Sequence, residues 1–305
     1  MTHDRVGDPG DGTVPTAIPG ESRYVETNGV TLHTIDAGPT TGRLVVLLHG
    51  FPEFWYGWAE AIRPLVEAGY RVLVPDQRGY NRSEKPDTVS AYSVDALAAD
   101  IVGLIDACDR ETAAIVGHDW GAAVGWWTAL HHPGRLSGLV AANVPHPTVF
   151  TETLRTSWRQ RFSSWYFLAF QVPALPERAV RLGNWRPVTR VMRRTSRSNT
   201  FSEADFDRYR RAWDQPGAFT GMVNWYRAVV RDRPSLTADR VTVPTKLLWG
   251  DEDRFLESEM ARASVDKCET GTLRVFPEAT HWIHHEQPTA VSDAITSHLQ
   301  ATDRA

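Results

Sequence analysis

The sequence predicts an α/β fold in which a mostly parallel central sheet is flanked by helices and interrupted by an inserted all-helical segment. From Tyr24 to about residue 147, short aliphatic and β-branched runs alternate with segments of helical periodicity, which is typical of βαβ units. From residue 148 to about residue 240, aromatic and arginine residues recur at helical spacings without a strand-like run. Strand-like runs then return. The simplest architecture is one α/β core with a helical insertion.

The first element expected is a β-hairpin. Tyr24–Thr27 and Val30–Asp36 are joined by Asn28-Gly29, and Asn-Gly is the strongest short signal for a two-residue hairpin turn. The strands that follow are expected to be buried on both faces, because their residues are continuously aliphatic or β-branched. These runs are 44–48, 70–75, 113–117 and 139–142.

Helices are expected between the buried strands and at the end of the chain. The clearest is Ser93–Cys108, where Ser93 can cap the helix and the apolar residues form one stripe. After the insertion, Val241–Trp249 and Thr272–Phe276 are expected as strands, and Pro288–Leu299 as a final helix. The expected organisation is a disordered tail (1–21), a first part of the α/β core (22–147), a helical cap (148–240) and a second part of the core (241–305).

Composition limits the classes of partner. The chain is 42% hydrophobic with a formal net charge of −4, which fits a large globular domain and gives no reason to expect nucleic acid or an anionic membrane as a general partner. No apolar run approaches the ~18 residues of a membrane span. The N-terminal tail lacks the apolar stretch of a signal peptide, and two cysteines, Cys108 and Cys268, suit a reducing compartment. We therefore expect a soluble cytoplasmic protein.

The stretch VGHDWGAAVG (116–125) predicts a nucleophile on a sharp turn. A strand that ends at Gly117 and a helix that begins near Trp120 place Asp119 between them, and flanking glycines permit that geometry. Attack on an sp³ carbon by serine would give an ether, whereas attack by a carboxylate gives an ester that water can hydrolyse. A carboxylate also needs no base to activate it near pH 7. Asp119 therefore predicts alkyl transfer rather than ester or amide hydrolysis.

Five motifs follow one another along the chain: HGFPEFWYGW (49–58), DQRGYNRS (76–83), GHDWGA (117–122), WGDED (249–253) and THWIHHEQP (280–288). In this order they resemble the α/β-hydrolase fold family and, within it, the epoxide hydrolases. The resemblance spans about residues 22 to 300. It implies an enzyme without cofactor or metal that converts a small apolar epoxide and water into a vicinal diol, under a helical cap.

The resemblance also implies the order nucleophile, acid and histidine along the chain. It places the catalytic base at His281, with an acid that orients the imidazole ring. WGDED offers Asp251, Glu252 and Asp253, and the resemblance favours Asp253. Some relatives place this acid after the sixth strand, but this chain has Asn143 there.

Backbone N–H groups are expected to form the oxyanion hole. The fold uses the residue after the nucleophile, here Trp120, and one in an earlier loop, here Phe51. The resemblance further implies a cis peptide bond between Phe51 and Pro52, and a substrate pocket that Pro52 and Trp120 line. Epoxide hydrolases carry two cap tyrosines that hold the epoxide oxygen, and their contexts match Tyr166 in SSWYFLAFQVP and Tyr226 in TGMVNWYRA.

Two other functions share parts of this pattern. A haloalkane dehalogenase uses the same aspartate, histidine and ester chemistry, but it binds the halide with indole N–H groups or with an asparagine where this chain has Phe51. A non-catalytic receptor on the same fold would be expected to have lost part of the triad. The identity of the epoxide is open, and a homodimer is possible.

Two polar groups of residues receive structural interpretations. His281, His284, His285 and Glu286 do not have the spacing of a zinc motif, so no metal site is expected, and His118 is expected to be structural or to lie at the pocket edge.

Arginines of the insertion are expected to form a solvated face, paired with acids such as Glu203 and Asp205, with capture of an anionic substrate as the alternative. These arginines are 178, 181, 186, 190, 193, 194 and 197.

Overall fold

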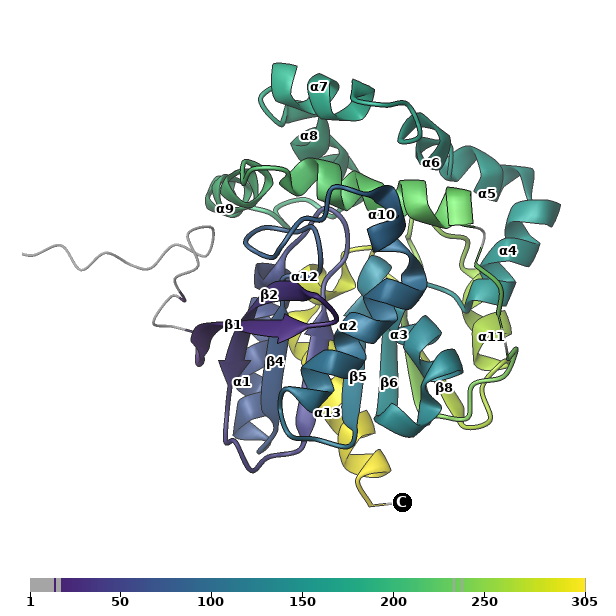
Figure 1. The fold of residues 1–305 in the computed structure, drawn as a ribbon. Coiled ribbons are helices and arrows are strands. Elements are labelled where there is room, and N and C mark those ends of the chain that lie inside the picture. The colour runs from purple at the N-terminus through teal and green to yellow at the C-terminus, as the bar shows by residue number, and fades with distance from the viewer. Residues whose placement is uncertain (1–13, 15–17, 233, 237, 305) are drawn as a thin grey trace, which may run out of the picture.

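The structure is a computed structural model that describes residues 14, 18–232, 234–236 and 238–304. Most of the expected tail at 1–21 lies outside these residues. The described chain forms an eight-stranded sheet with the order β1-β2-β4-β3-β5-β6-β7-β8. Helices cover both faces of the sheet, and the helical insertion lies above one end of it (Figure 1). The predicted α/β architecture is therefore confirmed.

The expected hairpin forms one edge of the sheet. β1 (Glu21–Thr27) pairs antiparallel with β2 (Val30–Ala37), and β1 begins three residues before the predicted start. Both residues of the turn have left-handed backbone, with φ of 45° at Asn28 and 74° at Gly29. This is the conformation that the two-residue Asn-Gly turn requires.

The remaining strands pair in parallel with one another, while β2 pairs antiparallel with β4. They are β3 (Leu44–Leu48), β4 (Arg71–Pro75), β5 (Ala113–His118), β6 (Leu136–Ala142), β7 (Thr245–Gly250) and β8 (Gly271–Phe276). β7 begins later than the predicted Val241, because Pro244 has no N–H for a ladder. Val241 instead makes an isolated bridge to Cys268.

Helices of the core pack on the two faces of the sheet. They are α1 (Ala59–Glu67), α2 (Val94–Asp106), α3 (Trp120–His131), α11 (Glu259–Val265), α12 (Ile283–Glu286) and α13 (Pro288–Thr302). α2 and α3 pack together on one face, and α1 packs with α13 on the other (Figure 1). The predicted cap of α2 is present, since the Ser93 side chain accepts a hydrogen bond from the N–H of Ala96 at 3.3 Å.

Between β6 and β7, the described residues form helices and no strand. These helices are α4 (Pro147–Thr156), α5 (Trp158–Ser163), α6 (Tyr166–Ala169), α7 (Leu175–Leu182), α8 (Arg186–Thr195), α9 (Glu203–Trp213) and α10 (Ala218–Asp232). They lie over the carboxyl ends of the parallel strands (Figure 1). We propose that residues 148–240 form the cap, with the core divided into 22–147 and 241–305. Across the described part of the chain, no helix combines the length and the apolar composition that crossing a membrane would require.

Close packing of α3 on the end of β3 gives a test of the fold. A Cβ at Gly121 would lie 2.1 Å from the carbonyl oxygen of Leu48. Because backbone atoms cannot move aside, we expect Gly121→Ala to lower the free energy of unfolding by about 1–3 kcal/mol. Gly134→Ala is the matched control, since no atom lies within 4 Å of its added Cβ. Urea unfolding should show a change within about 0.5 kcal/mol for the control, and equal losses in both variants would contradict the prediction.

Candidate active site

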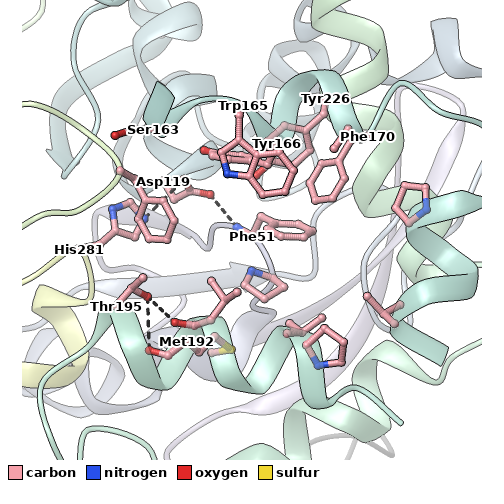
Figure 2. Close-up of a pocket in the computed structure, with 18 of the residues that line it drawn as sticks. Phe51, Asp119, Ser163, Trp165, Tyr166, Phe170, Met192, Thr195, Tyr226 and His281 are labelled. Atoms are coloured by element: carbon pink, nitrogen blue, oxygen red, sulfur yellow. Dashed lines mark hydrogen bonds and ion pairs between the residues drawn. The ribbon is translucent and has the colours of Figure 1, made fainter. Parts of the chain in front are cut away.

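Asp119 occupies the turn between β5 and α3. Its backbone has φ of 49° and ψ of −124°, a conformation that residues with a side chain rarely adopt. Neighbouring glycines allow the chain to turn so sharply, since a Cβ at Gly117 would lie 2.3 Å from the carbonyl oxygen of Gly121. The predicted sharp turn is therefore present. It places the Asp119 carboxylate in a cavity between the sheet and the cap helices (Figure 2).

Two groups face the oxygens of the Asp119 carboxylate. The N–H of Phe51 donates a hydrogen bond to Oδ1 at 2.8 Å, and Nε2 of His281 lies 3.6 Å from Oδ2. The peptide bond between Phe51 and Pro52 is cis, as the resemblance implies. Burial raises the pKa of Asp119, but His281, His118 and the Phe51 N–H outweigh it and lower this pKa. The carboxylate is therefore ionised at neutral pH.

Asp253, and not Asp251, contacts the histidine. Nδ1 of His281 lies 2.8 Å from Oδ2 of Asp253. Oδ1 of Asp253 accepts hydrogen bonds from the backbone N–H groups of Phe255 at 2.7 Å and Leu256 at 3.2 Å. Asp253 is thus fixed by its own loop, whereas Asp251 lies on the surface. Of the three acids that WGDED offers, the geometry favours Asp253.

Asn143 completes this arrangement, although sequence analysis assigned it no role. It follows β6 with φ of 50°. Its Nδ2 donates to Oδ2 of Asp253 at 2.7 Å, and its Oδ1 accepts from the N–H of Gly250 at 3.0 Å. Asn143 therefore ties the end of β6 to the end of β7 and shares Oδ2 of Asp253 with His281. The sequence signal for this role was the position of Asn143 after the sixth strand, where some relatives carry the acid of the triad.

His281 lies between two carboxylates. Burial lowers the pKa of its imidazole, but Asp253 and Asp119 together raise this pKa to about 10. At neutral pH the ring is therefore an imidazolium, stabilised on both sides. This charge state depends on both acids remaining ionised.

The two predicted cap tyrosines lie opposite Asp119 (Figure 2). Tyr166 begins α6, Tyr226 lies in α10, and their ring centroids are 5.7 Å apart. The ring of Tyr226 also packs edge-on against Phe51 at 5.3 Å and Trp120 at 5.0 Å. Burial, and then the charge of Asp119, raise the pKa of both tyrosines. Both hydroxyls are therefore protonated hydrogen-bond donors at neutral pH.

A cavity of about 620 Å³ brings Asp119, His281 and both tyrosines together. Most of its remaining wall is apolar and includes Phe51, Pro52, Phe170, Val180, Met192 and Phe219. Pro52 thus lies where the sequence placed it. Trp120 differs from the expectation: it is not among the lining residues, because Tyr226 packs against its ring and faces the cavity instead.

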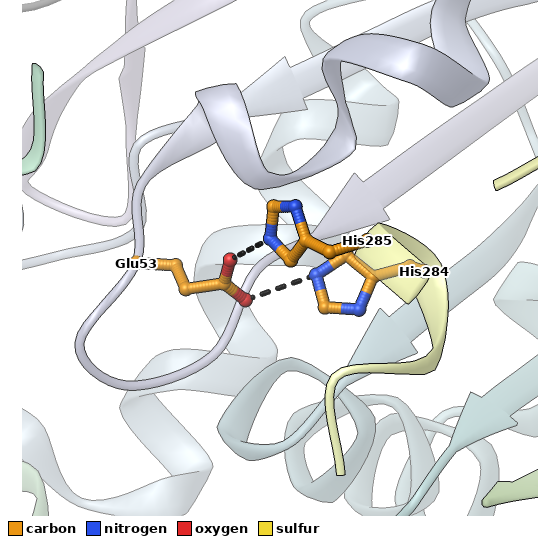
Figure 3. Close-up of side chains that lie close together, drawn as sticks. All are labelled: Glu53, His284 and His285. Atoms are coloured by element: carbon orange, nitrogen blue, oxygen red, sulfur yellow. Dashed lines mark hydrogen bonds and ion pairs between the residues drawn. The ribbon is translucent and has the colours of Figure 1, made fainter. Parts of the chain in front are cut away.

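Glu53 forms a second buried polar cluster next to this site. Its Oε1 accepts hydrogen bonds from the hydroxyl of Tyr209 at 2.8 Å and from Nε2 of His285 at 2.6 Å. Its Oε2 lies 3.1 Å from both Nδ1 of His118 and Nε2 of His284. Figure 3 shows the contacts of Glu53 with His284 and His285. Glu53, His284 and His285 are close enough together to ligate a metal. Because both carboxylate oxygens already accept two hydrogen bonds, we interpret the cluster, including His118, as structural.

Comparisons with known proteins agree with this geometry. The α/β hydrolase fold family matches residues 43–288. The chain is 44% identical over 278 residues to the AB hydrolase superfamily protein YfhM of Bacillus subtilis, covering 91% of this chain and 97% of that protein. It is 33% identical to Epoxide hydrolase A of Mycobacterium tuberculosis, covering 91% of this chain and 96% of that protein.

Solved structures of epoxide hydrolases have the same fold. A mutant of an epoxide hydrolase from Bacillus megaterium superposes with a TM-score of 0.84 at 28% identity, covering 91% of this chain and 100% of that one. Epoxide Hydrolase A from Mycobacterium thermoresistibile gives a TM-score of 0.79 at 31% identity, covering 92% of this chain and 98% of that one. The chain therefore belongs to the epoxide hydrolases of the α/β-hydrolase fold family.

Proposed function

We propose that this enzyme hydrolyses an apolar epoxide to a vicinal diol through an ester formed on Asp119. The observation that carries the proposal is the arrangement around one cavity, with Asp119 and His281 on the core side and Tyr166 and Tyr226 on the cap side. The apolar wall favours an uncharged substrate. Proton donors and an ionised nucleophile then face each other across the space where that substrate would lie.

In the proposed first step, Asp119 opens the epoxide ring. Oδ1 of Asp119 is held by the Phe51 N–H, which leaves Oδ2 to attack a ring carbon. The carbon–oxygen bond of the ring breaks, and the departing oxygen takes a proton from Tyr166 or Tyr226. A tyrosine with a raised pKa is suited to this role, because it still carries its proton at neutral pH. The product is a hydroxyalkyl ester of Asp119.

In the proposed second step, His281 activates water. Ester formation removes the charge of Asp119, and the pKa of His281 falls because one of its two stabilising carboxylates is gone. The proton that His281 loses replaces the one that the tyrosine gave up. The neutral imidazole then takes a proton from water, which attacks the ester carbon. The backbone N–H groups of Phe51 and Trp120 are proposed to stabilise the resulting oxyanion. When the oxyanion collapses, the bond from the carbonyl carbon to the alkyl oxygen breaks and that oxygen takes the second proton of the attacking water. The diol then leaves, with the Asp119 carboxylate and the His281 imidazolium regenerated.

The dehalogenase alternative would need a halide site beside Asp119. At the relevant position the chain offers the ring of Phe51, and the indole of Trp120 packs behind Tyr226 rather than lining the cavity. The two tyrosines would have no role in that reaction. The geometry therefore favours the epoxide.

We also propose a cytoplasmic location. Cys108 and Cys268 are buried free thiols, which suits a reducing compartment. A homodimer stays a prediction.

Trapping the ester tests the proposed reaction directly. Without its base, the His281→Gln enzyme should open the epoxide but fail to hydrolyse the ester. After mixing with styrene oxide and with alkyl epoxides, intact-protein mass should rise by the mass of a whole epoxide. Adding Asp119→Ala should abolish the gain. If alkyl bromides leave an alkyl group on Asp119 while no epoxide adds, the enzyme is a dehalogenase and the proposal is wrong.

The cap tyrosines are tested by removing both hydroxyls. Tyr166→Phe combined with Tyr226→Phe should lower the rate of ring opening by about 10²–10⁴-fold, since no acid then protonates the departing oxygen. Single-turnover kinetics measures this step. Tyr24→Phe, on the exposed edge strand, is the matched control and should leave the rate unchanged. Normal turnover in a folded double variant would refute the role assigned to the two hydroxyls.

The dependence of His281 on Asp119 gives a prediction of pKa. Replacing Asp119 with Asn removes a charge that stabilises the imidazolium, so the pKa of His281 should fall below its value of about 10. Asp253→Asn should lower it further, because Asp253 is closer, at 2.8 Å compared with 3.6 Å. NMR titration measures both values, with His281→Gln identifying the signals. An unchanged pKa in the Asp119→Asn variant would mean that ester formation does not release the base.

A further inference from the structure

The cap helix α5 has a polar side chain on its inner face and aromatic side chains on its outer face. Gln160 is fully buried, and its amide donates hydrogen bonds to the carbonyl of Phe255 at 2.8 Å and to the hydroxyl of Ser164 at 3.0 Å. Trp158 and Phe162, four residues apart, are 79% and 75% exposed. A surface helix of a globular protein normally places its apolar side inward. The outward aromatics of α5 therefore need an explanation.

This apolar surface continues across the neighbouring helices. Of the eleven large apolar side chains exposed among the described residues, eight lie between residues 158 and 191. We call them the cap patch: Trp158, Phe162, Trp165, Leu168, Val172, Leu175, Leu182 and Val191. They come from α5 to α8 and the loops between them, which lie on the side of the cap away from the sheet (Figure 1). Single exposed apolar residues are ordinary, but a concentration of this kind marks an interaction surface.

Four residues of the cap patch also line the catalytic cavity. Phe162, Trp165, Leu175 and Val191 each have half or more of their surface exposed, and each also lines the cavity. The apolar wall of the cavity is therefore continuous with the outer surface of the cap. A molecule bound at the patch would reach Asp119 without leaving apolar surroundings.

Positive charge is concentrated in the same segment. Residues 148–199 contain ten arginines and two glutamates, a net charge of +8 in a chain whose total is −4. Arg159 and Arg161 flank the aromatic face of α5, and both are exposed. Exposed arginines also follow one another along α7 and α8, at 178, 181, 186, 190, 193 and 194. The helices that carry the apolar patch thus also carry exposed positive charge.

The acids expected to neutralise these arginines do so in part. Arg193 pairs with Glu203, as the sequence predicts. Asp205 instead pairs with Arg208 at 3.2 Å, on its own helix. Within the segment, Glu177 faces inward to Arg227 at 2.8 Å. The surface around the patch therefore keeps most of its positive charge.

We propose that the cap patch and its arginines dock on an anionic lipid surface, and that the epoxide enters the cavity from that surface. This rests on the proposed function for the nature of the substrate. Tryptophan, phenylalanine and leucine enter the interfacial region of a bilayer, while arginines bind the phosphates around them. A second copy of the chain fits less well, because a two-fold contact between caps would place +8 against +8.

Vesicle flotation of the full-length protein tests the docking. Binding is expected to vesicles of phosphatidylglycerol and phosphatidylcholine, to weaken with added salt, and to be absent with phosphatidylcholine alone. Trp158→Ser with Leu168→Ser should lower the partition coefficient about tenfold or more, and so should Arg159→Glu with Arg178→Glu. Val275→Ser and Arg262→Glu are matched controls on exposed positions of β8 and α11, and should bind as the unmodified protein does.

Kinetics separates docking from catalysis, because none of these substituted residues lines the cavity. The cap variants should hydrolyse styrene oxide in solution at the unmodified rate, but should lose rate on a long-chain alkyl epoxide dissolved in anionic vesicles. Normal turnover of styrene oxide without vesicle binding would overturn the inference and leave the proposed function standing. Vesicle binding without turnover of any epoxide would overturn the proposed function and the route of substrate entry, and support the docking surface alone. Dimerisation that the cap variants abolish, without vesicle binding, would assign the patch to a second copy.

Discussion

The ion pairs of His281 with Asp253 and Asp119 are the interaction on which the site depends. The three residues follow β8, β7 and β5, so their distances are set by the parallel register of the sheet. A buried imidazolium would be costly alone, but here it faces a carboxylate at 2.8 Å and another at 3.6 Å. Ester formation would remove the charge of Asp119. The contact of Asp119 with His281, which stabilises the imidazolium before the reaction, would then be lost and would free His281 to act as the base in the second step.

The loop after β3, whose Phe51 N–H binds Asp119, also contacts the cap. The indole of Trp213 donates to the carbonyl of Pro52 at 2.6 Å, and the hydroxyl of Tyr209 donates to Glu53 at 2.8 Å. Tyr226 packs on Phe51. Phe51 of this loop therefore both donates a hydrogen bond to Asp119 and packs against the cap tyrosine Tyr226. This loop therefore links the position of the nucleophile to that of a cap tyrosine.

Local signals were sufficient for the elements of the fold and for the residues on its turns. Asn28-Gly29 predicts the hairpin because a two-residue turn needs left-handed backbone, and the glycines around Asp119 predict the sharp turn for a similar steric reason. Asn143 and Glu53 were not foreseen, since their partners lie about 110 and 230 residues away and only the folded sheet brings them together. Local signals also do not decide which of the Trp120 and Tyr226 rings faces the cavity, because packing between distant helices sets it.

Net charge is a coarse guide to partners because it averages over surfaces that face different ways. The segment 148–199 carries +8 and the rest of the chain −12, so a total of −4 hides the excess positive charge of this segment. An apolar epoxide is held in a lipid phase by the same transfer free energy that would drive it into this cavity. If the cavity opens directly toward lipid, the epoxide does not have to pass through water. The unfavourable transfer free energy from lipid to water then does not oppose its entry. The outward aromatics and arginines of the cap are then part of the substrate route rather than an unexplained exception to the packing of the core.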